Sequence, residues 1–491
     1  MLHQIKEEIK LNIRARYPVL YVVSSEEERV ERLIADIGSE LRRNVYFWSC
    51  TDGFQGVAET QLAMPALNFV ADSGDRGIFV LKDFHTMFDE PKVVRRVRDL
   101  IVNMRRNMKT LVFFSPIVKI PPEFERDVVI FDIPLPDSAE LLVILKNFLA
   151  SMSKSPDVKI LVTPPMLERV VNAVLGLTEN QALNVFAKVV VADQKFSEED
   201  LPLMINEKRQ IIRKAGLLEF YEPGCGIGDV GGLANLKRWL TERAGAFGAE
   251  ARAYGLPEPK GLLLLGVQGC GKSLTAKAIA DLWKLPLLRL DVGSLFGQYI
   301  GMSEENMRRA IKIAESLAPT ILWLDEIEKG LSGMKGGGGG DGGTTARVFS
   351  TFLTWLQEKT KPVFVVATAN NIADLPPELL RKGRFDEIFF IDLPSEAERK
   401  KIFEIHLVKR KRNPAKFELD KLAAAATEYS GAEIEQAIVS AMYGGFVDKK
   451  REINSEDILK AIRESVPLST TMKEAIAELR NWCTQRARPA S

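Results

Sequence analysis

Cysteine and histidine are scarce in this chain of 491 residues. The four cysteines (Cys50, Cys225, Cys270 and Cys483) have no paired spacing, and the three histidines are far apart in the sequence. The sequence therefore argues against a disulfide framework and against a zinc site made of cysteine or histidine. Such cysteine usage is typical of a reducing compartment, so we expect a cytoplasmic protein.

The chain also has no excess of either charge and no long apolar run. It contains 67 lysines and arginines against 66 aspartates and glutamates, a formal net charge of +1. This balance gives no support to a nucleic-acid or membrane partner. Residues 1–8 lack the apolar core of a signal peptide, and no run approaches the roughly 20 residues that cross a membrane. We expect a soluble globular protein of about two to four domains.

A phosphate-binding loop lies in the second half of the chain. Residues 266–273 read Gly-Val-Gln-Gly-Cys-Gly-Lys-Ser, the pattern G-x-x-x-x-G-K-S. An apolar run at 261–265, typical of a buried strand, precedes the loop, and good helix formers follow it. The glycines let backbone N–H groups converge on an anion, Lys272 can reach the outer phosphates, and Ser273 can bind Mg²⁺. A glycine turn that happens to precede Lys-Ser is the alternative, which both flanks disfavour.

Two later strands end in polar residues. The apolar run 320–324 leads into Asp325 and Glu326. Behind a phosphate loop, Asp325 can hold Mg²⁺ through water, and Glu326 can orient or activate the attacking water. The strand 363–369 ends at Asn370, whose amide could sense the γ-phosphate or place the water. The alternatives are a surface Asp-Glu pair and an Asx turn.

Two other segments carry weaker candidates. Arg381 and Arg384 lie three apart at an expected helix end, and a planar guanidinium can stabilise transition-state charge on a neighbouring subunit. A glycine turn at 227–233, which includes Val230 and Gly231, can pack its backbone against an adenine edge. Taken alone, the arginines would be a solvated helix terminus and the glycines an ordinary turn.

The first half alternates between strands and helices. Strands are expected at 19–23, 44–48, 77–83 and 110–114, and helices at 26–41 and 93–108. Such alternation predicts a parallel α/β sheet.

A sequence pattern of the first half recurs in the second. Residues 111–136 resemble 363–394, and the helical stretch 164–200 resembles 420–457. We infer two copies of one unit, each made of an α/β sheet and a helical lid. An unrelated α/β domain with chance similarity is the alternative.

The first copy has lost its phosphate loop. Ser24-Ser25-Glu26-Glu27-Glu28 stands where that loop would lie, and Asp83-Phe84 replaces the Asp-Glu pair. Three carboxylates would repel phosphate, and no lysine replaces the missing charge. We therefore expect only the second copy to be a working nucleotide site.

With these motifs in order, the second half, from Ile227 to Pro467, resembles the AAA family of ring ATPases. Residues 266–273 match its Walker A motif, Asp325-Glu326 its Walker B motif, and Asn370 its sensor 1. The resemblance implies a P-loop NTPase-type parallel sheet with a C-terminal helical lid, and ATP and Mg²⁺ as ligands. Arg381 and Arg384 match arginine fingers that act in trans, which implies a homo-oligomer, a hexameric ring in this family.

The resemblance assigns the remaining site residues. His406 matches a histidine near the ribose and adenine, and Ser430–Glu433 resembles the sensor-2 turn, here with Gly431-Ala432 and no arginine. Tyr299 and Ile300 match the first pore loop, which grips an extended polypeptide; a buried Tyr-Ile pair is the alternative. The expected nucleotide-binding set is Val230, Gly231, Gly266, Gln268, Gly269, Cys270, Gly271, Lys272, Ser273, Leu274, Asp325, His406, Gly431 and Ala432.

The whole chain is similar to divergent two-part AAA proteins of plastid genomes and cyanobacteria, so the plastid stroma is the expected location if the gene is in a plastid. We expect a degenerate AAA-like domain (1–205), a linker (206–226), an AAA ATPase domain (227–395), its lid (396–467) and a C-terminal helix with a tail (468–491). The glycine-rich run 333–343 is expected to be a mobile loop, near the second pore loop of the family or a passive linker, before a helix that begins at Arg347.

The expected function is Mg²⁺-dependent ATP hydrolysis that drives remodelling or threading of a protein. The alternatives are an ATP-gated scaffold that recruits partners through its first half and, more weakly, a nucleic-acid loader. The thiol of Cys270 lies beside amide dipoles that lower a thiol pKa, so a redox switch is conceivable. A small residue that matters only through its backbone is the favoured reading.

Overall fold

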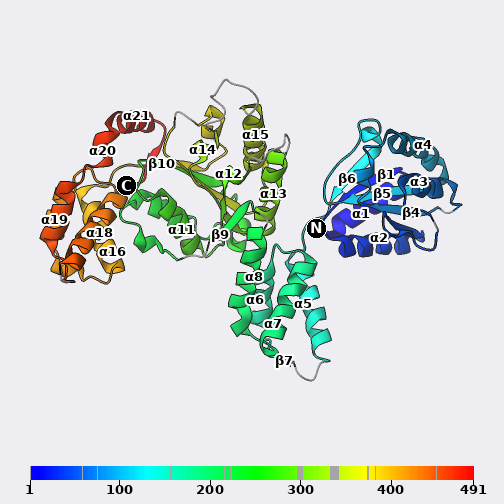
Figure 1. Cartoon of the computed structure of the whole chain (residues 1–491), viewed down its shortest axis with the longest axis horizontal. Helices are drawn as coiled ribbons and strands as arrows, with labels where there is room; N and C mark the ends of the chain where they lie inside the picture. Colours follow the sequence, from blue (N-terminus) through cyan, green and yellow to red (C-terminus); the bar gives the residue numbers. More distant parts are fainter. Residues whose placement is uncertain are drawn as a thin grey trace. The chain divides into compact units, whose positions relative to one another are not determined.

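The computed structural model describes residues 2–57, 59–74, 76–154, 158–214, 216–221, 224–295, 302–331, 342–372, 375–381, 383–448 and 450–491. The chain divides into two compact units, Met1–Lys208 and Arg209–Ser491 (Figure 1). Each unit contains a largely parallel sheet between layers of helices, which confirms the predicted α/β class. Among the described residues, no helix combines the length and the apolar character that a membrane crossing requires.

The described part of the first unit contains a six-stranded sheet in the order β3-β2-β4-β5-β1-β6. Every neighbouring pair is parallel except β2 with β3. The strands are β1 (Val19–Val23), β2 (Val45–Ser49), β3 (Gly53–Phe54), β4 (Ile78–Lys82), β5 (Thr110–Ser115) and β6 (Val128–Asp132). The helices of this layer are α1 (Leu2–Arg14), α2 (Glu27–Leu41), α3 (Ala63–Asp72) and α4 (Pro91–Asn107).

Helices cover both faces of this sheet, because successive side chains of a strand point to opposite faces and both sets are apolar here. Leu20 and Val22 of β1 pack with α1 and α2, whereas Tyr21 packs with α3 and α4. All five residues of β1 are buried, as expected of a parallel strand with helices on both sides.

A helical lid completes the first unit. It contains α5 (Ser138–Met152), α6 (Pro164–Val174), α7 (Glu179–Asp193) and the part of α8 (Leu201–Lys214) up to Lys208, with the short parallel pair β7 (Lys159–Ile160) and β8 (Lys195–Phe196). Capping boxes at Asp137 and Thr178 fix the starts of α5 and α7.

In the second unit, the described residues form a seven-stranded sheet in the order β15-β14-β10-β13-β12-β11-β9. The strands are β9 (Leu218–Tyr221), β10 (Gly261–Gly266), β11 (Leu287–Leu290), β12 (Thr320–Leu324), β13 (Val363–Ala369), β14 (Glu387–Ile391) and β15 (Arg488–Pro489). The order β14-β10-β13-β12-β11 repeats the order β6-β1-β5-β4-β2 of the first unit. This shared topology agrees with the internal repeat inferred from the sequence.

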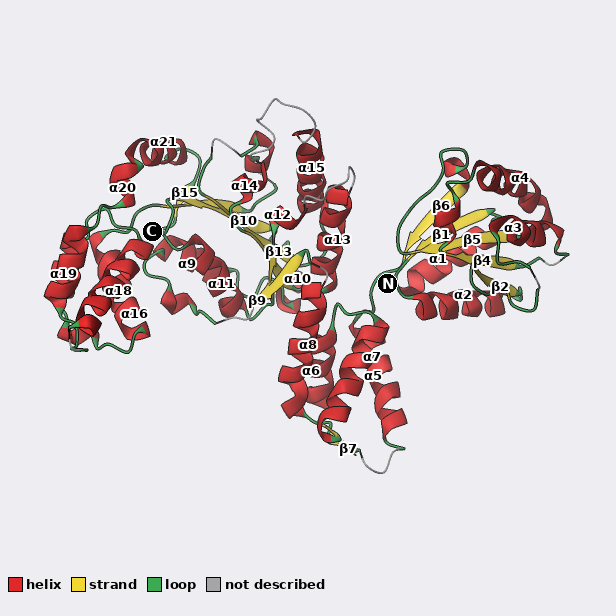
Figure 2. Cartoon of the chain, in the orientation of Figure 1, coloured by secondary structure: helices red, strands yellow, loops and turns green. Residues whose placement is uncertain are grey.

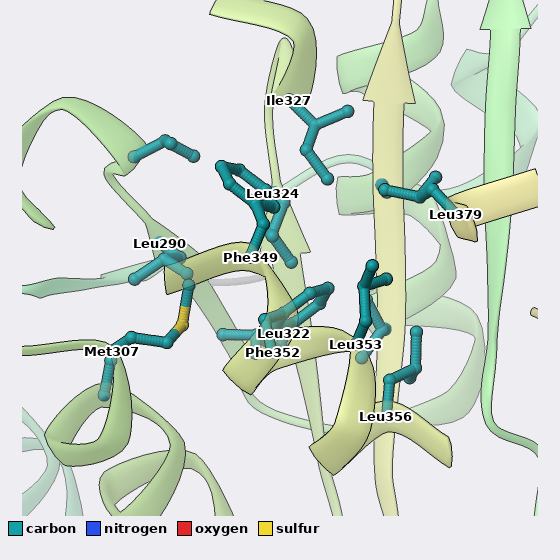
Figure 3. Close-up of a cluster of buried hydrophobic side chains, with 14 of the residues drawn as sticks. Leu290, Met307, Leu322, Leu324, Ile327, Phe349, Phe352, Leu353, Leu356 and Leu379 are labelled. Carbon is teal, nitrogen blue, oxygen red and sulfur yellow. The ribbon is translucent and has the colours of Figure 1, made fainter. Parts of the chain in front are cut away.

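Helices cover both faces of the second sheet. One layer contains α9 (Ala234–Glu242) and α11 (Lys272–Trp283), and the other contains α13 (Met302–Ser316) and α15 (Gly342–Glu358). Figure 3 shows the second layer, where Phe349 and Phe352 of α15 meet Leu322 and Leu324 of β12. Burying one such phenylalanine contributes up to about 3 kcal/mol. The shorter helices are α10 (Ala249–Tyr254), α12 (Val292–Leu295) and α14 (Ile327–Leu331).

The lid of the second unit has a core of its own. It contains α16 (Glu396–Lys409), α17 (Leu419–Ala425), α18 (Gly431–Val447) and α19 (Ser455–Glu464). The short helices α20 (Leu468–Thr471) and α21 (Lys473–Cys483) follow it. Capping boxes at Ser395 and Ser430 start α16 and α18, at the places where Asp137 and Thr178 start α5 and α7 in the first lid.

Three details differ from the sequence prediction. The expected linker, 206–226, contains the end of α8 and the strand β9, which pairs antiparallel with β11 because Leu218 and Phe220 supply apolar positions. The expected tail contains β15. Helix α15 begins at Gly342 rather than at Arg347, since packing against the sheet can outweigh the low helix propensity of glycine. The predicted pore residues Tyr299 and Ile300, and residues 333–341, lie outside the described residues.

Candidate nucleotide site

The phosphate loop connects β10 to α11 at the carboxyl edge of the second sheet. Gly271 occupies the N-cap position of α11 with φ 88°, a left-handed conformation that favours glycine. A Cβ atom at Gly271 would meet nothing within 4 Å. The start of α11 therefore opens onto free space, where its N–H groups and its dipole can receive an anion.

Lys272 lies inside this loop. Its Nζ donates to the carbonyl oxygens of Gly266 and Val267, at 2.8 Å in both cases. Burial lowers the pKa of Lys272 to about 8. The two carbonyl groups are neutral and do not balance the charge of the ammonium group. A bound phosphate would balance it, so Lys272 is placed to bind an anionic ligand.

Ser273, Asp325 and Thr368 form a hydrogen-bonded group beside the loop. Asp325 Oδ1 accepts hydrogen bonds from Ser273 Oγ at 3.1 Å and from Thr368 Oγ1 at 2.7 Å. The hydroxyl and carboxylate oxygens are the hard ligands that Mg²⁺ prefers, usually together with water and substrate phosphates. Ser273 and Asp325 would therefore be suitable ligands for a Mg²⁺ ion.

Glu326 follows Asp325 in a left-handed backbone conformation, with φ 49°. This conformation is uncommon for residues other than glycine. One carboxylate oxygen accepts from Asn370 Nδ2 at 3.2 Å, and the other lies 2.5 Å from Lys329 Nζ. Asn370 is itself oriented by Glu328, whose Oε1 accepts from both its backbone N–H and its Nδ2. A carboxylate and an amide thus meet where they can orient a water molecule.

The opposite side of the site carries apolar side chains, among them Val230 and Ile402, and suits a nucleobase. A Cβ atom at Gly231 would lie 2.5 Å from Ile402 Cγ1, so the turn that contains Val230 packs directly on α16. His406, one helical turn further along, lies 3.6 Å from Glu435. Burial lowers the pKa of His406 and favours its neutral form, which suits contact with a base or a ribose.

One pocket of about 680 Å³ joins these two sides. This volume is within the range typical of small-molecule and cofactor sites. The lid contributes through Ala432, whose N–H donates to Gly269 O at 3.1 Å. The sequence-predicted residues that line the pocket are Val230, Gly231, Gln268, Gly269, Cys270, Gly271, Lys272, Ser273, Leu274, Asp325, Glu326, Asn370, His406, Gly431 and Ala432.

Other predicted residues lie apart from this pocket. Gly266 contributes only its carbonyl, to Lys272. Arg381 and Arg384 follow the short 3-10 turn Pro377–Leu380 and do not line the pocket of their own unit. The Arg384 guanidinium donates to the carbonyl of Glu378, and the side chain of Arg381 is exposed.

The structure adds residues that the sequence reasoning missed. Thr368 holds Asp325, and Glu328 holds Asn370. The sequence could have indicated Thr368, because residues two apart on a strand point to the same face and Thr368 lies two residues before the candidate Asn370. Glu398 and Ser491 also line the pocket, and only the tertiary structure brings them there.

The expectation for the Cys270 thiol was wrong in direction. Burial raises its pKa to about 12, and this effect outweighs the nearby charge of Lys272. The thiol is therefore neutral at physiological pH, which removes the basis for a reactive thiolate in the loop.

The corresponding position of the first unit is filled by its own side chains. Glu26 and Arg29 are both buried and pair at 2.7 Å, and Arg29 also reaches Glu140 at 3.1 Å. Glu26 Oε1 accepts from the backbone N–H of Glu179, where α7 begins. The expectation that no lysine replaces the lost charge needs a correction, since β4 brings Lys82 within 2.7 Å of Glu27. Lys82 is paired with carboxylates, however, and so is not free for phosphate.

Three family models match the sequence of the chain. Residues 262–393 match "ATPase family associated with various cellular activities (AAA)". Residues 5–133 match "SpoVK-like AAA ATPase, N-terminal domain", and residues 139–215 match "SpoVK-like AAA ATPase, second domain".

Two of three known proteins compared with the chain match it over nearly its whole length, and the third matches less than half. It is 42% identical over 496 residues to the "Uncharacterized AAA domain-containing protein ycf46" of Pyropia yezoensis, covering 99% of both chains. It is 43% identical over 488 residues to the protein of the same name from Guillardia theta, covering 97% of this chain and 94% of that protein. A proteasome-activating nucleotidase of Aeropyrum pernix is 32% identical over 215 residues, covering 43% of this chain and 52% of that protein.

Proposed function

This chain belongs to the AAA family of ATPases, and from that premise we propose that it hydrolyses ATP with Mg²⁺ as a hexameric ring of identical subunits. One observation carries the proposal: the phosphate loop, the Ser273–Asp325 pair and the Glu326–Asn370 pair line a single pocket. Lys272 and the start of α11 would bind the phosphates, Ser273 and Asp325 would hold Mg²⁺, and Glu326 with Asn370 would orient water. When bound, the metal ion would supply positive charge against the negative charge that develops during phosphoryl transfer.

The ring is proposed because the arginines at 381 and 384 have no role in the pocket of their own unit. An exposed guanidinium supplied by the neighbouring subunit would stabilise the transition state there. The first unit, whose corresponding position is filled by Glu26 and Arg29, is proposed to bind no nucleotide.

A mixing experiment tests the shared site. Arg384→Ala alone should reduce Mg²⁺-dependent ATP hydrolysis at least tenfold, and Lys272→Ala alone should be inactive. An equal mixture should regain roughly a quarter of the wild-type rate, because an intact loop then meets an intact arginine at a quarter of the interfaces. Arg463→Ala, an exposed lid arginine paired with Glu456, is the control and should be fully active. A mixture no more active than its components contradicts a site shared between subunits.

We further propose that the ring remodels or threads a protein substrate. Support comes from the partial relative of Aeropyrum pernix, which its name describes as a nucleotidase that activates a proteasome. The rival is an ATP-gated scaffold that recruits partners through its first unit and threads nothing.

Tyr299 separates the two candidates. Tyr299→Ala should keep ATP hydrolysis within twofold of wild type but lose ATP-dependent unfolding of a fluorescent protein that carries an unstructured tag. Tyr299→Phe should keep both, because the aromatic ring supplies sequence-tolerant grip. Equal unfolding by Tyr299→Ala and wild type would contradict a gripping role for Tyr299, whereas ATP-dependent assembly without any unfolding by the wild type would favour the scaffold.

A further inference from the structure

The segment 488–491 is built into the nucleotide-binding unit. Residues Arg488 and Pro489 form β15, which pairs in parallel with β14. The Ala490 N–H donates to Phe390 O at 2.9 Å, and the Ala490 carbonyl accepts from the Leu236 N–H at 3.0 Å. Ala490 is 1% exposed and lies in the core shared by α9 and the sheet. Figure 2 shows the C-terminus between this sheet and the lid helices.

The segment places Ser491 at the mouth of the nucleotide pocket. Ser491 Oγ donates to Glu398 Oε1 at 2.6 Å. Asn235 Nδ2 donates to the main-chain oxygen of Ser491, also at 2.6 Å, and so fixes the residue from the side of α9. Ser491 is exposed to solvent yet lines the pocket, so it belongs to the rim of the site.

Glu398 connects Ser491 to the base side of the pocket through hydrogen bonds. The oxygen that receives Ser491 also accepts from the Leu233 N–H at 3.2 Å, and the other oxygen accepts from Ser395 N–H and Oγ. Burial would raise the pKa of the Glu398 carboxyl, but the hydrogen bonds from Ser491, Ser395 and Leu233 lower it. A Cβ atom at Gly232 would lie 2.0 Å from Glu398 Oε1, so the carboxylate touches the turn that contains Val230 and Gly231.

A second contact comes from the helix just before this segment. Arg480 of α21 donates through Nε and Nη2 to the carboxylate of Asp392, at 2.8 to 3.0 Å. Asp392 and Glu398 lie on either side of the turn that joins β14 to the lid helix α16. Residues 480–491 therefore hold both ends of the connection between sheet and lid.

We propose that residues 488–491 are a support for the nucleoside side of the pocket, with Ser491 a positioning residue that acts on the bound adenine nucleotide through Glu398. The inference rests on the proposed function, in which this pocket binds ATP. Because the contact lies on the base side, it strengthens ATP and ADP binding alike. It contributes nothing to the binding of the phosphate chain by itself.

The test compares nucleotides with inorganic tripolyphosphate, a ligand that has no base. Ser491→Ala should weaken ATP and ADP binding roughly threefold, because the lost hydrogen bond is exposed to solvent and acts on the nucleotide only through Glu398, and deletion of 488–491 should weaken binding by up to about tenfold. Tripolyphosphate affinity and the rate at saturating ATP should stay at wild-type values. Ser491→Thr, which keeps the hydroxyl, should restore nucleotide affinity. Thr484→Ala, which removes an exposed hydroxyl that donates to the carbonyl of Arg480 at the end of α21, is the matched control.

The deletion also removes a strand and the buried Ala490, whereas Ser491→Ala leaves both in place. If the deletion variant does not fold, the nucleotide affinity of Ser491→Ala alone therefore tests the inference. Unchanged nucleotide affinity in Ser491→Ala overturns the inference, and so does an equal loss for tripolyphosphate, which would indicate general loosening of the loop. If the wild type binds neither nucleotide nor tripolyphosphate, the proposed function fails as well, and that result is distinguishable from the other two.

Discussion

Glu326→Gln will reduce ATP hydrolysis by about 10²- to 10³-fold while ATP remains bound, because glutamine keeps the shape of the side chain but cannot accept a proton. The carboxylate lies beside Asn370 at the end of β12, whereas Lys272 is held by carbonyls of the loop. The substitution therefore acts on the chemical step and spares phosphate binding. Single-turnover hydrolysis and ATP affinity, measured on the same preparation, separate the two effects.

The control for this substitution is Glu452→Gln, an exposed lid carboxylate that pairs with Arg412. It changes the same functional group away from the pocket and should leave hydrolysis at the wild-type rate. Wild-type turnover by Glu326→Gln would remove Glu326 from the mechanism. Loss of ATP binding would instead assign it to the binding site. Because ATP stays bound, the same variant is suited to capturing a protein substrate in a pull-down.

Lys272→Ala will lose ATP binding itself, by at least about a hundredfold. In the structure, the ammonium group makes two hydrogen bonds with loop carbonyls, and a nucleotide would offer it charged phosphate oxygens instead. Two charge-assisted hydrogen bonds contribute about 3 kcal/mol or more, which is a hundredfold in affinity. Titration with a fluorescent ATP analogue measures this loss directly.

The same lysine predicts a pH dependence. Its pKa is lowered to about 8 in the nucleotide-free chain, and the phosphates need its protonated form. Wild-type affinity should therefore hold below pH 8 and weaken as the pH rises above it, whereas the residual affinity of Lys272→Ala should not follow this trend. Lys277→Ala, later on the same helix with its Nζ over the ring of Tyr221, is the control and should bind as wild type. Equal affinity in Lys272→Ala and Lys277→Ala would contradict a phosphate-binding role for the loop.

Much of the fold followed from local patterns. The runs at 19–23 and 261–265 are apolar at every position, which is what a strand buried on both faces requires. The α/β class was predicted correctly for this reason, and family membership was predicted from the order of the motifs. The edge strands β9 and β15 were missed, because two to four residues carry too little periodicity to distinguish a strand from a loop.

The sequence by itself determined the chemistry of the site: a glycine loop with lysine and serine, and acidic and amide residues at strand ends. These lie close together because parallel strands end at one edge of the sheet. Only the tertiary structure decided how these groups are held. It placed Glu328 on Asn370, partly buried Cys270 so that its pKa rises, and brought Ser491 to Glu398 across 93 residues of sequence. Hydrogen-bond partners and burial depend on which distant segments fold onto one another. Local sequence patterns do not specify those long-range contacts.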